Sequence, residues 1–171
     1  MRALLGILLL LPATVAVAQS APAARAPATA AAPARPAPAL TPDQQAQLAK
    51  QDTEMLAQAQ RVAQMVDAGR MGEIWDGSSA VAKRAGAREA FVTHVRQDRE
   101  RLGALVSRGT GAVTRVQYPA GAAVPEGLYI NVNFPTRFAN NAQPVRELIS
   151  FRLDEDRVWR VSGYSVRAAG K

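Results

Sequence analysis

Apolar residues recur at helical spacing in the segment that follows residue 41. The intervals between them are three, four or seven residues, as expected for a helix with one buried face, and the residues concerned are Leu48, Met55, Ala59, Val62 and Val66. Thr41 suits the N-cap, Pro42 the first helical position and Gln44 the third position of a capping box. We therefore expect a long helix from residue 42 to residue 68, ended by Gly69.

Two further helices are predicted downstream. A short one covers residues 70–76 and carries Met71 and Trp75, and the sequence DGSS then interrupts it. The other covers residues 87–102, where Phe91, Val95 and Leu102 share one face, and it ends at Gly103.

The rest of the chain has the pattern of strands. Apolar and polar residues alternate strictly over 128–135, which is typical of a half-buried strand, and strands are also expected over 105–117, 144–153 and 158–167. Gly109 and Gly111 suggest a bulge or bend within 105–117. A tight turn at 154–157 joins the last two. Helices followed by antiparallel strands predict an α+β fold, with three helices packed on one face of a four-stranded antiparallel sheet.

The last strand contains the sequence VWRVSGYSVR. Trp159 and Val161 fall on one face of a two-residue alternation, whereas Tyr164 falls on the other. A bulge at Ser162-Gly163 would bring all of them to the buried face, and glycine tolerates such backbone geometry. We therefore interpret this segment as a bulged core strand, in which Gly163→Val should be strongly destabilising.

The N-terminus predicts export. An apolar run from Ala3 to Leu11 follows Arg2, and Ala16-Val17-Ala18 fits a cleavage site after Ala18. The run is shorter than a membrane-spanning helix, so no transmembrane segment is expected after cleavage. Residues 1–18 are thus a predicted signal peptide, and an uncleaved N-terminal anchor is the alternative. The absence of cysteine from an exported chain favours the periplasm.

A linker separates this signal from the folded part. Residues 19–40 contain eleven Ala and five Pro, a composition that blocks regular helix and buries little surface. The predicted organisation is therefore a signal peptide over 1–18, a disordered linker over 19–40 and a single α+β domain over 41–171. That domain carries 18 Lys+Arg and 14 Asp+Glu, a net charge of +4.

Several chemistries are excluded or weakened. The chain has no Cys and a single His94, too few ligands for a zinc site, and the carboxylates of residues 154–156 are interpreted as a solvated turn rather than a calcium site. No G-x-S-x-G motif accompanies His94, which we place at a helix flank. No metal or other cofactor is expected.

A pocket enzyme is the catalytic alternative. An acid with a raised pKa beside a Tyr donor could transfer protons between helix and sheet, and the available residues are Asp67, His94, Tyr129, Glu147 and Tyr164. Strand parity places Tyr129 opposite the buried positions, facing solvent or a partner. Glu147 shares the parity of Val145 and Ile149, and a structural salt bridge to Arg99 or Arg108 is the preferred interpretation.

Binding is the function class that the composition favours. Arg146, Arg152 and Arg160 should project from the outer face of the sheet. They could contact an anionic envelope component or an acidic envelope protein; a merely solvated polar face is the alternative. Nucleic acid is not an expected partner, because the chain is exported and few aromatic residues interleave with the basic ones.

The spacing of distinctive residues resembles the bacterial family of domain of unknown function 4019. The resemblance covers roughly residues 57–167 and rests on Leu102-Gly103, Arg108, PEGLY at 125–129, FPTRF at 134–138, Glu147, Asp156 and WRVSGY at 159–164. Asp67, Gly69, Trp75 and Arg99 also fit. The chain departs from the family's pattern at three positions. Phe91 stands where the family usually has Trp, Arg101 where it usually has Pro, and Arg157 where it usually has the glycine of the turn. The resemblance implies exported proteins with a cystatin-like or nuclear-transport-factor-like α+β fold and implies no activity.

The hypothesis at this stage is a non-catalytic accessory or binding module of the cell envelope. A small pocket enzyme using Tyr164, His94 and Glu147 is the alternative, and homodimerisation through the exposed sheet face is compatible with both. The candidate binding residues are His94, Arg108, Tyr129, Glu147, Arg160 and Tyr164.

Overall fold

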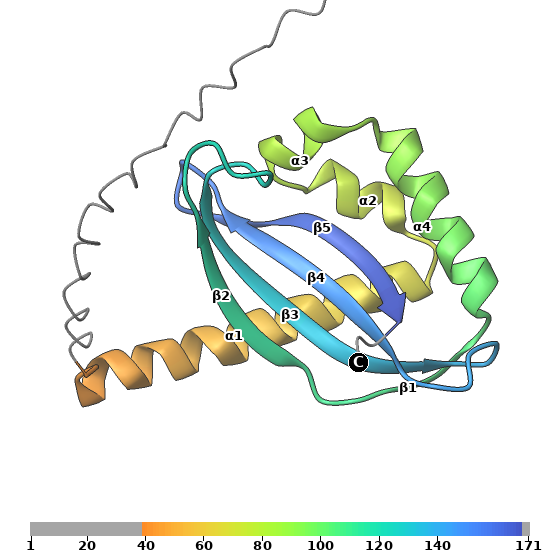
Figure 1. The fold of residues 1–171 in the computed structure, drawn as a ribbon, viewed down its shortest axis with the longest axis horizontal. Helices are drawn as coiled ribbons and strands as arrows, with labels where there is room; N and C mark the ends of the chain where they lie inside the picture. The colour runs from red at the N-terminus through yellow and green to blue at the C-terminus, as the bar shows by residue number, and fades with distance from the viewer. Residues whose placement is uncertain (1–38, 169–171) are drawn as a thin grey trace, which may run out of the picture. The chain divides into compact units, whose positions relative to one another are not determined.

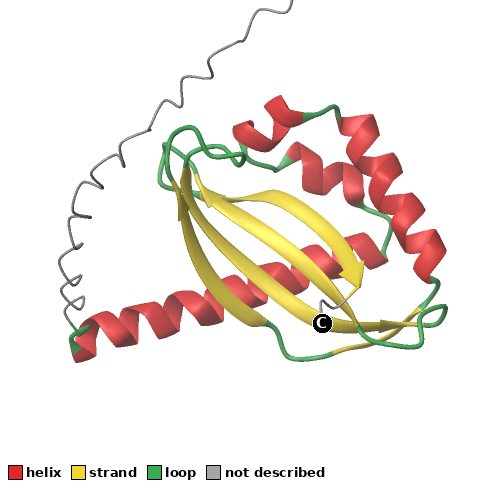
Figure 2. Cartoon of the chain, in the orientation of Figure 1, coloured by secondary structure: helices red, strands yellow, loops and turns green. Residues whose placement is uncertain are grey.

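Four helices precede five strands in the part of the chain that the structure, a computed structural model, describes, residues 39–168 (Figures 1 and 2). Residues 1–38 and 169–171 lie outside the described residues, and so do the predicted signal peptide, its cleavage after Ala18 and nearly all of the predicted linker. The elements are α1 (Pro42–Asp67), α2 (Met71–Asp76), α3 (Ala80–Ala85), α4 (Arg88–Leu102), β1 (Leu105–Arg108), β2 (Ala112–Tyr118), β3 (Gly127–Phe138), β4 (Val145–Leu153) and β5 (Trp159–Ala168).

Helix α1 begins with the predicted capping box. The Thr41 hydroxyl accepts from the Gln44 backbone amide at 3.3 Å, and the Thr41 amide donates to Gln44 Oε1 at 2.9 Å. These bonds satisfy amide groups that a helix start otherwise leaves without partners. The predicted apolar face is buried at Met55, Ala59, Val62, Ala63 and Val66. Through this face α1 packs across β2, β3 and β4, running behind the sheet in Figure 1.

The other three helices form a second group beside β5. Helices α2 and α4 pack on each other, and α3 and α4 reach β5 (Figure 1). Helix α3 is absent from the sequence prediction, which treated DGSS only as an interruption. Ser79 in that stretch is in fact an N-cap, because its hydroxyl accepts from the Val81 amide.

The sheet is antiparallel with the order β1-β3-β4-β5, and β2 also pairs with β3. Five strands replace the predicted four because the segment expected over 105–117 is two strands. The break lies at 109–111, where the Gly109 amide donates to the Pro135 carbonyl at 2.8 Å. A Cβ on Gly111 would lie 2.6 Å from the Phe134 ring, so only glycine permits this close approach.

Strand β5 has the predicted bulge. The pairing with β4 shifts between Ser150 and Phe151, so that Ser162 is the extra residue. Trp159, Val161, Tyr164 and Val166 all pack against the core as expected. The predicted need for glycine is wrong, however: Gly163 has no positive φ, and a Cβ there would meet only the Ser150 Cβ, at 3.9 Å.

The two faces of the sheet differ sharply. The inner face, turned toward α1, buries Ile130, Val132, Phe134, Ile149 and Phe151 in one cluster with helical residues. Thr136 and Glu147 are fully buried on that same face. Side chains alternate between faces along a strand, so the residues between these, among them Arg137 and Arg146, belong to the outer face. A buried carboxylate in an apolar layer requires partners, and these partners define the first candidate site.

Candidate functional site

Glu147 is the centre of a buried polar network on the inner face. Its side chain is 0% exposed, and Arg108 Nε donates to its Oε2 at 2.7 Å. The Thr136 hydroxyl donates to Oε2 at 2.8 Å, and the Tyr164 hydroxyl donates to Oε1 at 2.9 Å. The register of the sheet produces this convergence, because Thr136 pairs with Arg108 on β1 and with Val145 on β4, while Glu147 pairs with Val166 on β5.

Asp67 and Arg99 close the network toward the surface. Arg108 Nη2 donates to Asp67 Oδ2 at 3.0 Å, and Arg99 Nη2 donates to Asp67 Oδ1 at 2.8 Å. Arg99 also stacks over the Phe138 ring, with Cζ 4.2 Å from its centroid. We call these residues the Glu147 cluster: Asp67, Arg99, Arg108, Thr136, Glu147 and Tyr164.

Two pKa shifts follow from this arrangement. Burial raises the pKa of the Tyr164 phenol, and the neighbouring negative charge of Glu147 raises it further. Burial on its own would lower the pKa of Arg108, but hydrogen bonds and charge attraction from Glu147 and Asp67 outweigh it, and the pKa is raised. Both side chains therefore stay protonated at neutral pH.

The Glu147 cluster holds its central carboxylate in a fully hydrogen-bonded ion pair. The Glu147 oxygens accept bonds from Arg108, Thr136 and Tyr164, so the carboxylate has neither an open face nor a free route to a substrate proton. The predicted salt bridge to Arg108 is confirmed. Arg99 Nη1 lies 4.0 Å from Glu147 Oε1 and is a buried donor without a hydrogen-bond partner among the described residues.

His94 lies elsewhere. Its side chain is 72% exposed on α4, where Nε2 faces Asp98 Oδ2 at 3.4 Å. It lines a surface hollow with Gln97, Asp98, Glu100 and Arg101, and neither Glu147 nor Tyr164 lines that hollow. The structure therefore does not bring together the three groups of the predicted pocket enzyme.

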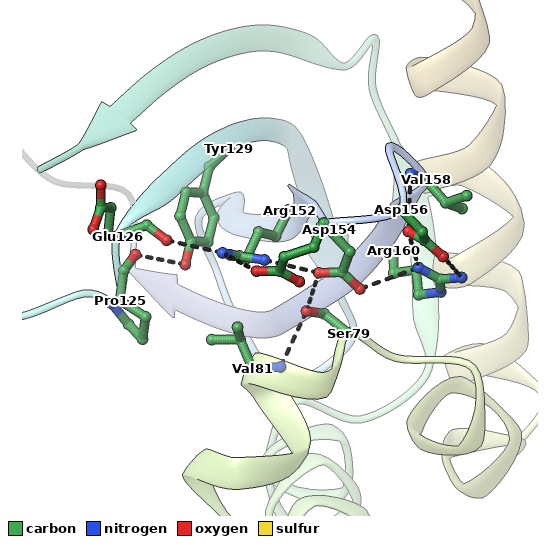
Figure 3. Close-up of polar contacts among 11 residues, drawn as sticks. Ser79, Val81, Pro125, Glu126, Tyr129, Arg152, Asp154, Asp156, Val158 and Arg160 are labelled. Carbon is green, nitrogen blue, oxygen red and sulfur yellow. Dashed lines mark hydrogen bonds and ion pairs between the residues drawn. The ribbon is translucent and has the colours of Figure 1, made fainter. Parts of the chain in front are cut away.

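A second polar network surrounds Asp154, at the opposite end of β4 (Figure 3). Asp154 accepts from the Ser79 hydroxyl at 2.6 Å, from Arg152 Nη1 at 3.0 Å and from Arg160 Nη1 at 3.2 Å. Arg160 continues to Asp156 with two more bonds. We call these residues the Asp154 cluster: Ser79, Arg152, Asp154, Asp156 and Arg160.

The Asp154 cluster corrects two expectations. The turn at 154–157 is not simply solvated, because Asp154 is 8% exposed. Burial works to raise the pKa of Asp154, yet the hydrogen bonds from Ser79, Arg152 and Arg160 prevail and lower it. Arg152 and Arg160 are therefore neutralised by carboxylates and do not form a free basic face, whereas Arg146 is exposed.

Tyr129 is buried and belongs beside this second network. Its outer-face parity is as predicted, but its exposed fraction is only 5%. The hydroxyl donates to the Pro125 carbonyl at 2.9 Å, and the ring meets Tyr118 edge-on at 5.3 Å between centroids. Parity could not reveal this burial, since it depends on the edge strand β2 and on the 119–126 loop.

A pocket lies between the second helix group and β5. It has a volume of about 250 Å³, and its wall consists of Trp75 and Phe91, small residues of α3 and α4, and β5 residues; the lining is Trp75, Ser78, Ala82, Ala85, Gly86, Ala87, Ala90, Phe91, Val161, Ser162, Gly163 and Tyr164. The bulge residue Ser162 belongs to this lining, and its hydroxyl is buried without a hydrogen-bond partner among the described residues. We call it the helix–sheet pocket.

Of the six candidate residues, Arg108, Glu147 and Tyr164 converge in the Glu147 cluster. Tyr129 and Arg160 lie at the Asp154 end of the sheet, and His94 lies apart from both. Ser79 and Asp154 were missed as members of a site. The sequence signal for them was the Ser N-cap inside DGSS together with the Asp that opens the last hairpin turn.

Within residues 39–168 no helix is both long and apolar enough to cross a bilayer. Over the same range, His, Asp and Glu side chains nowhere gather into a group of three that could hold a metal ion.

Comparison with known proteins identifies one family. The family described as "Protein of unknown function (DUF4019)" matches residues 58–164. The matched segment spans most of the helices and strands, including both polar clusters. No curated protein and no solved structure matches the chain significantly.

Proposed function

Since the chain belongs to the DUF4019 family, whose description names no activity, we propose from its geometry that it is an exported, non-catalytic binding module of the cell envelope. The ligand site in this proposal is the helix–sheet pocket, and the ligand is a small, mainly apolar molecule. Export comes from the predicted signal peptide over 1–18.

One observation carries the proposal: the lining of the helix–sheet pocket contains no carboxylate, histidine or basic residue. Its only titratable group is Tyr164, whose hydroxyl is already bonded to Glu147 at 2.9 Å. General acid–base chemistry needs a group that can exchange a proton with the substrate. A pocket of this lining can bind but has no such group to offer.

The shape and chemistry of the lining support the ligand class. Small-molecule sites are concave and mostly apolar, with a few placed polar groups that orient the ligand. Trp75 and Phe91, 5.5 Å apart between ring centroids, supply an aromatic wall. The rest of the lining is small and apolar apart from Ser78, Ser162 and Tyr164, which suits a mainly apolar ligand.

The test uses Trp75 as its reporter. Trp159 is replaced by Phe so that Trp75 is the single tryptophan, and its fluorescence is followed during titration with an apolar naphthalene probe. Ala82→Leu places a larger side chain in the pocket wall and should abolish the probe's effect. The matched control, Ala46→Leu on the exposed side of α1, should leave it unchanged.

Native mass spectrometry of the protein purified from the exported fraction completes the experiment. The expected species is a chain beginning at Gln19 that carries an added mass, which Ala82→Leu loses. Equal probe response in the Ala82→Leu and Ala46→Leu variants would refute the pocket as the site. A chain that retains residues 1–18 would refute cleavage and leave the pocket result standing on its own.

A further inference from the structure

Three arginines gather at one end of the outer sheet face, the face turned toward the viewer in Figure 1. Arg146 on β4 lies directly opposite Arg167 on β5 and also opposite Pro135 on β3. Arg137 follows Pro135 by two residues, so it shares this face and is the diagonal neighbour of Arg146. We call Arg137, Arg146 and Arg167 the outer arginines.

The outer arginines lack the carboxylate partners that other arginines of this domain have. All three residues are exposed, and none takes part in an ion pair within the described residues. The Glu147 and Asp154 clusters, in contrast, pair Arg99, Arg108, Arg152 and Arg160 with Asp or Glu. The charge of the outer arginines is therefore available to a partner.

Their placement is unfavourable without such a partner. Opposite residues of antiparallel strands have Cβ atoms about 4.5–5.5 Å apart, and like charges there repel. Arg146 and Arg167 are such a pair. An anionic group bound between them would relieve the repulsion, and guanidinium groups match phosphate oxygens with two parallel hydrogen bonds.

An exposed apolar residue lies beside the outer arginines. Arg137 pairs with Ser107 of β1, and the residue before Ser107 is Val106, where the pairing of β1 with β3 shifts. Val106 is 63% exposed. Arginines beside a protruding apolar side chain suit a lipid surface, where the charges meet headgroup phosphates and the apolar group enters the interface.

We propose that the outer arginines, with Val106, form a docking surface for a bilayer of anionic phospholipid. This role is independent of the helix–sheet pocket, which opens beside β5 and the second helix group. The domain touches the bilayer peripherally, and the interaction weakens with salt because exposed charges are screened.

The experiment is cosedimentation of the full mature chain with vesicles. Phosphatidylglycerol mixed with phosphatidylcholine is the anionic probe, pure phosphatidylcholine is the neutral one, and each is used at low and high salt. The test variant is Arg137→Gln/Arg146→Gln/Arg167→Gln. The control, Lys50→Gln/Arg61→Gln/Arg84→Gln, removes the same charge from exposed helix positions. Circular dichroism confirms that both variants fold.

Binding to the anionic vesicles is expected for the wild type and the control. Each arginine near an anionic surface contributes a factor of about five to partitioning, so the test variant should bind on the order of 100-fold less tightly. Val106→Ser should lower the part of the binding that survives high salt.

Three results would overturn the proposal. An equal loss of vesicle binding in the two triple variants would show that binding depends on the protein's net charge and not on the position of the outer arginines. Equal binding to pure phosphatidylcholine vesicles would show that the net negative charge of the headgroups plays no part. Binding of inorganic phosphate or an acidic peptide, measured by calorimetry, without any vesicle binding would assign the outer arginines to a soluble anion or a protein.

Discussion

Burial of the Tyr164 phenol makes this residue sensitive to alkaline conditions. Its folded-state pKa is raised above the ordinary value of 10.0, by burial first and by the Glu147 charge second. A raised pKa means that the folded protein holds the proton more tightly than the unfolded chain does. The resulting stabilisation is fully present below pH 10 and is lost as the pH rises from there toward the folded-state pKa.

The free energy of unfolding should therefore fall more steeply above pH 10 in the wild type than in Tyr164→Phe. At neutral pH the same variant should lose about 1.5–3 kcal/mol, because it removes one hydrogen bond to the charged Glu147 carboxylate. Urea unfolding at a series of pH values measures both quantities, with Tyr118→Phe as the comparison. Parallel pH profiles for wild type and Tyr164→Phe would contradict this explanation.

Arg157 has a strained backbone conformation. It has φ of 63°, the only positive φ of a non-glycine residue among the described residues, and it stands where the resembling family has glycine. A residue with a Cβ in this conformation costs about 1–2 kcal/mol, whereas glycine adds about 0.5–1 kcal/mol of unfolded-chain entropy. Arg157→Gly should therefore raise stability by up to about 1 kcal/mol.

Thermal unfolding measures this gain as a rise of a few degrees in Tm. Arg157→Val is the matched opposite, because a β-branched residue resists positive φ most strongly, and its Tm should fall. A lower Tm for Arg157→Gly than for the wild type would show that contacts of the arginine side chain outweigh the strain.

At the scale of elements, the Glu147 carboxylate connects four strands. It lies on β4 and accepts from Arg108 on β1, Thr136 on β3 and Tyr164 on β5. Breaking a buried ion pair by removing one partner costs about 3–5 kcal/mol, because the other charge stays buried. Glu147→Gln should lower the free energy of unfolding by this amount, as measured by urea denaturation.

Glu100→Gln on the exposed side of α4 is the control and should change stability by no more than about 0.5 kcal/mol. Thr136→Val is a milder change in the same network and should cost about 1.5–3 kcal/mol, because it removes one hydrogen bond to a charged carboxylate. It provides a second measurement if Glu147→Gln does not fold. An unchanged free energy of unfolding in Glu147→Gln would mean that Asp67 alone is a sufficient ion-pair partner for Arg108.

The helices and strands also show what local pattern can predict. Capping at Thr41, the apolar face of α1 and the bulge of β5 were predictable because each depends on neighbouring residues. Gly109 and Gly111 indicated a bulge or bend within 105–117. The full division into two strands was not predictable, since it depends on the contact of Gly111 with Phe134, over twenty residues away. Helix α3 has Val81 as its one large apolar residue, whereas α2, of the same length, has Met71, Ile74 and Trp75, so α3 carries too little apolar periodicity to be detected.

At the scale of the whole molecule, the two polar clusters also differ in whether the sequence could predict them. Parity placed Glu147 on the inner face, and a buried carboxylate required an arginine, so the Arg108 pair was predictable. The Asp154 cluster was not, because it joins Ser79 of the helical half to the last hairpin across 75 positions. The unpaired state of the outer arginines follows only from knowing which arginines are paired elsewhere.

The core itself makes a prediction about the whole chain. Every residue of the inner-face cluster lies between Met55 and Val166, and the capping box that starts α1 begins at Thr41. A chain of residues 39–171 contains all of these contacts. It should unfold with the same Tm as the chain 19–171, to within about 2 °C, because none of the buried groups or caps described within residues 39–168 is removed.

Scanning calorimetry of the two chains measures the difference. A loss of about 1 kcal/mol corresponds to roughly 4–8 °C in a domain of this size, so a drop of 5 °C or more would mean that residues before Ala39 contact the core. The chain 46–171 removes Thr41 and the first turn of α1, and it should lose the capping contribution of about 1 kcal/mol. Together the two truncations place the start of the cooperative unit at the Thr41 cap.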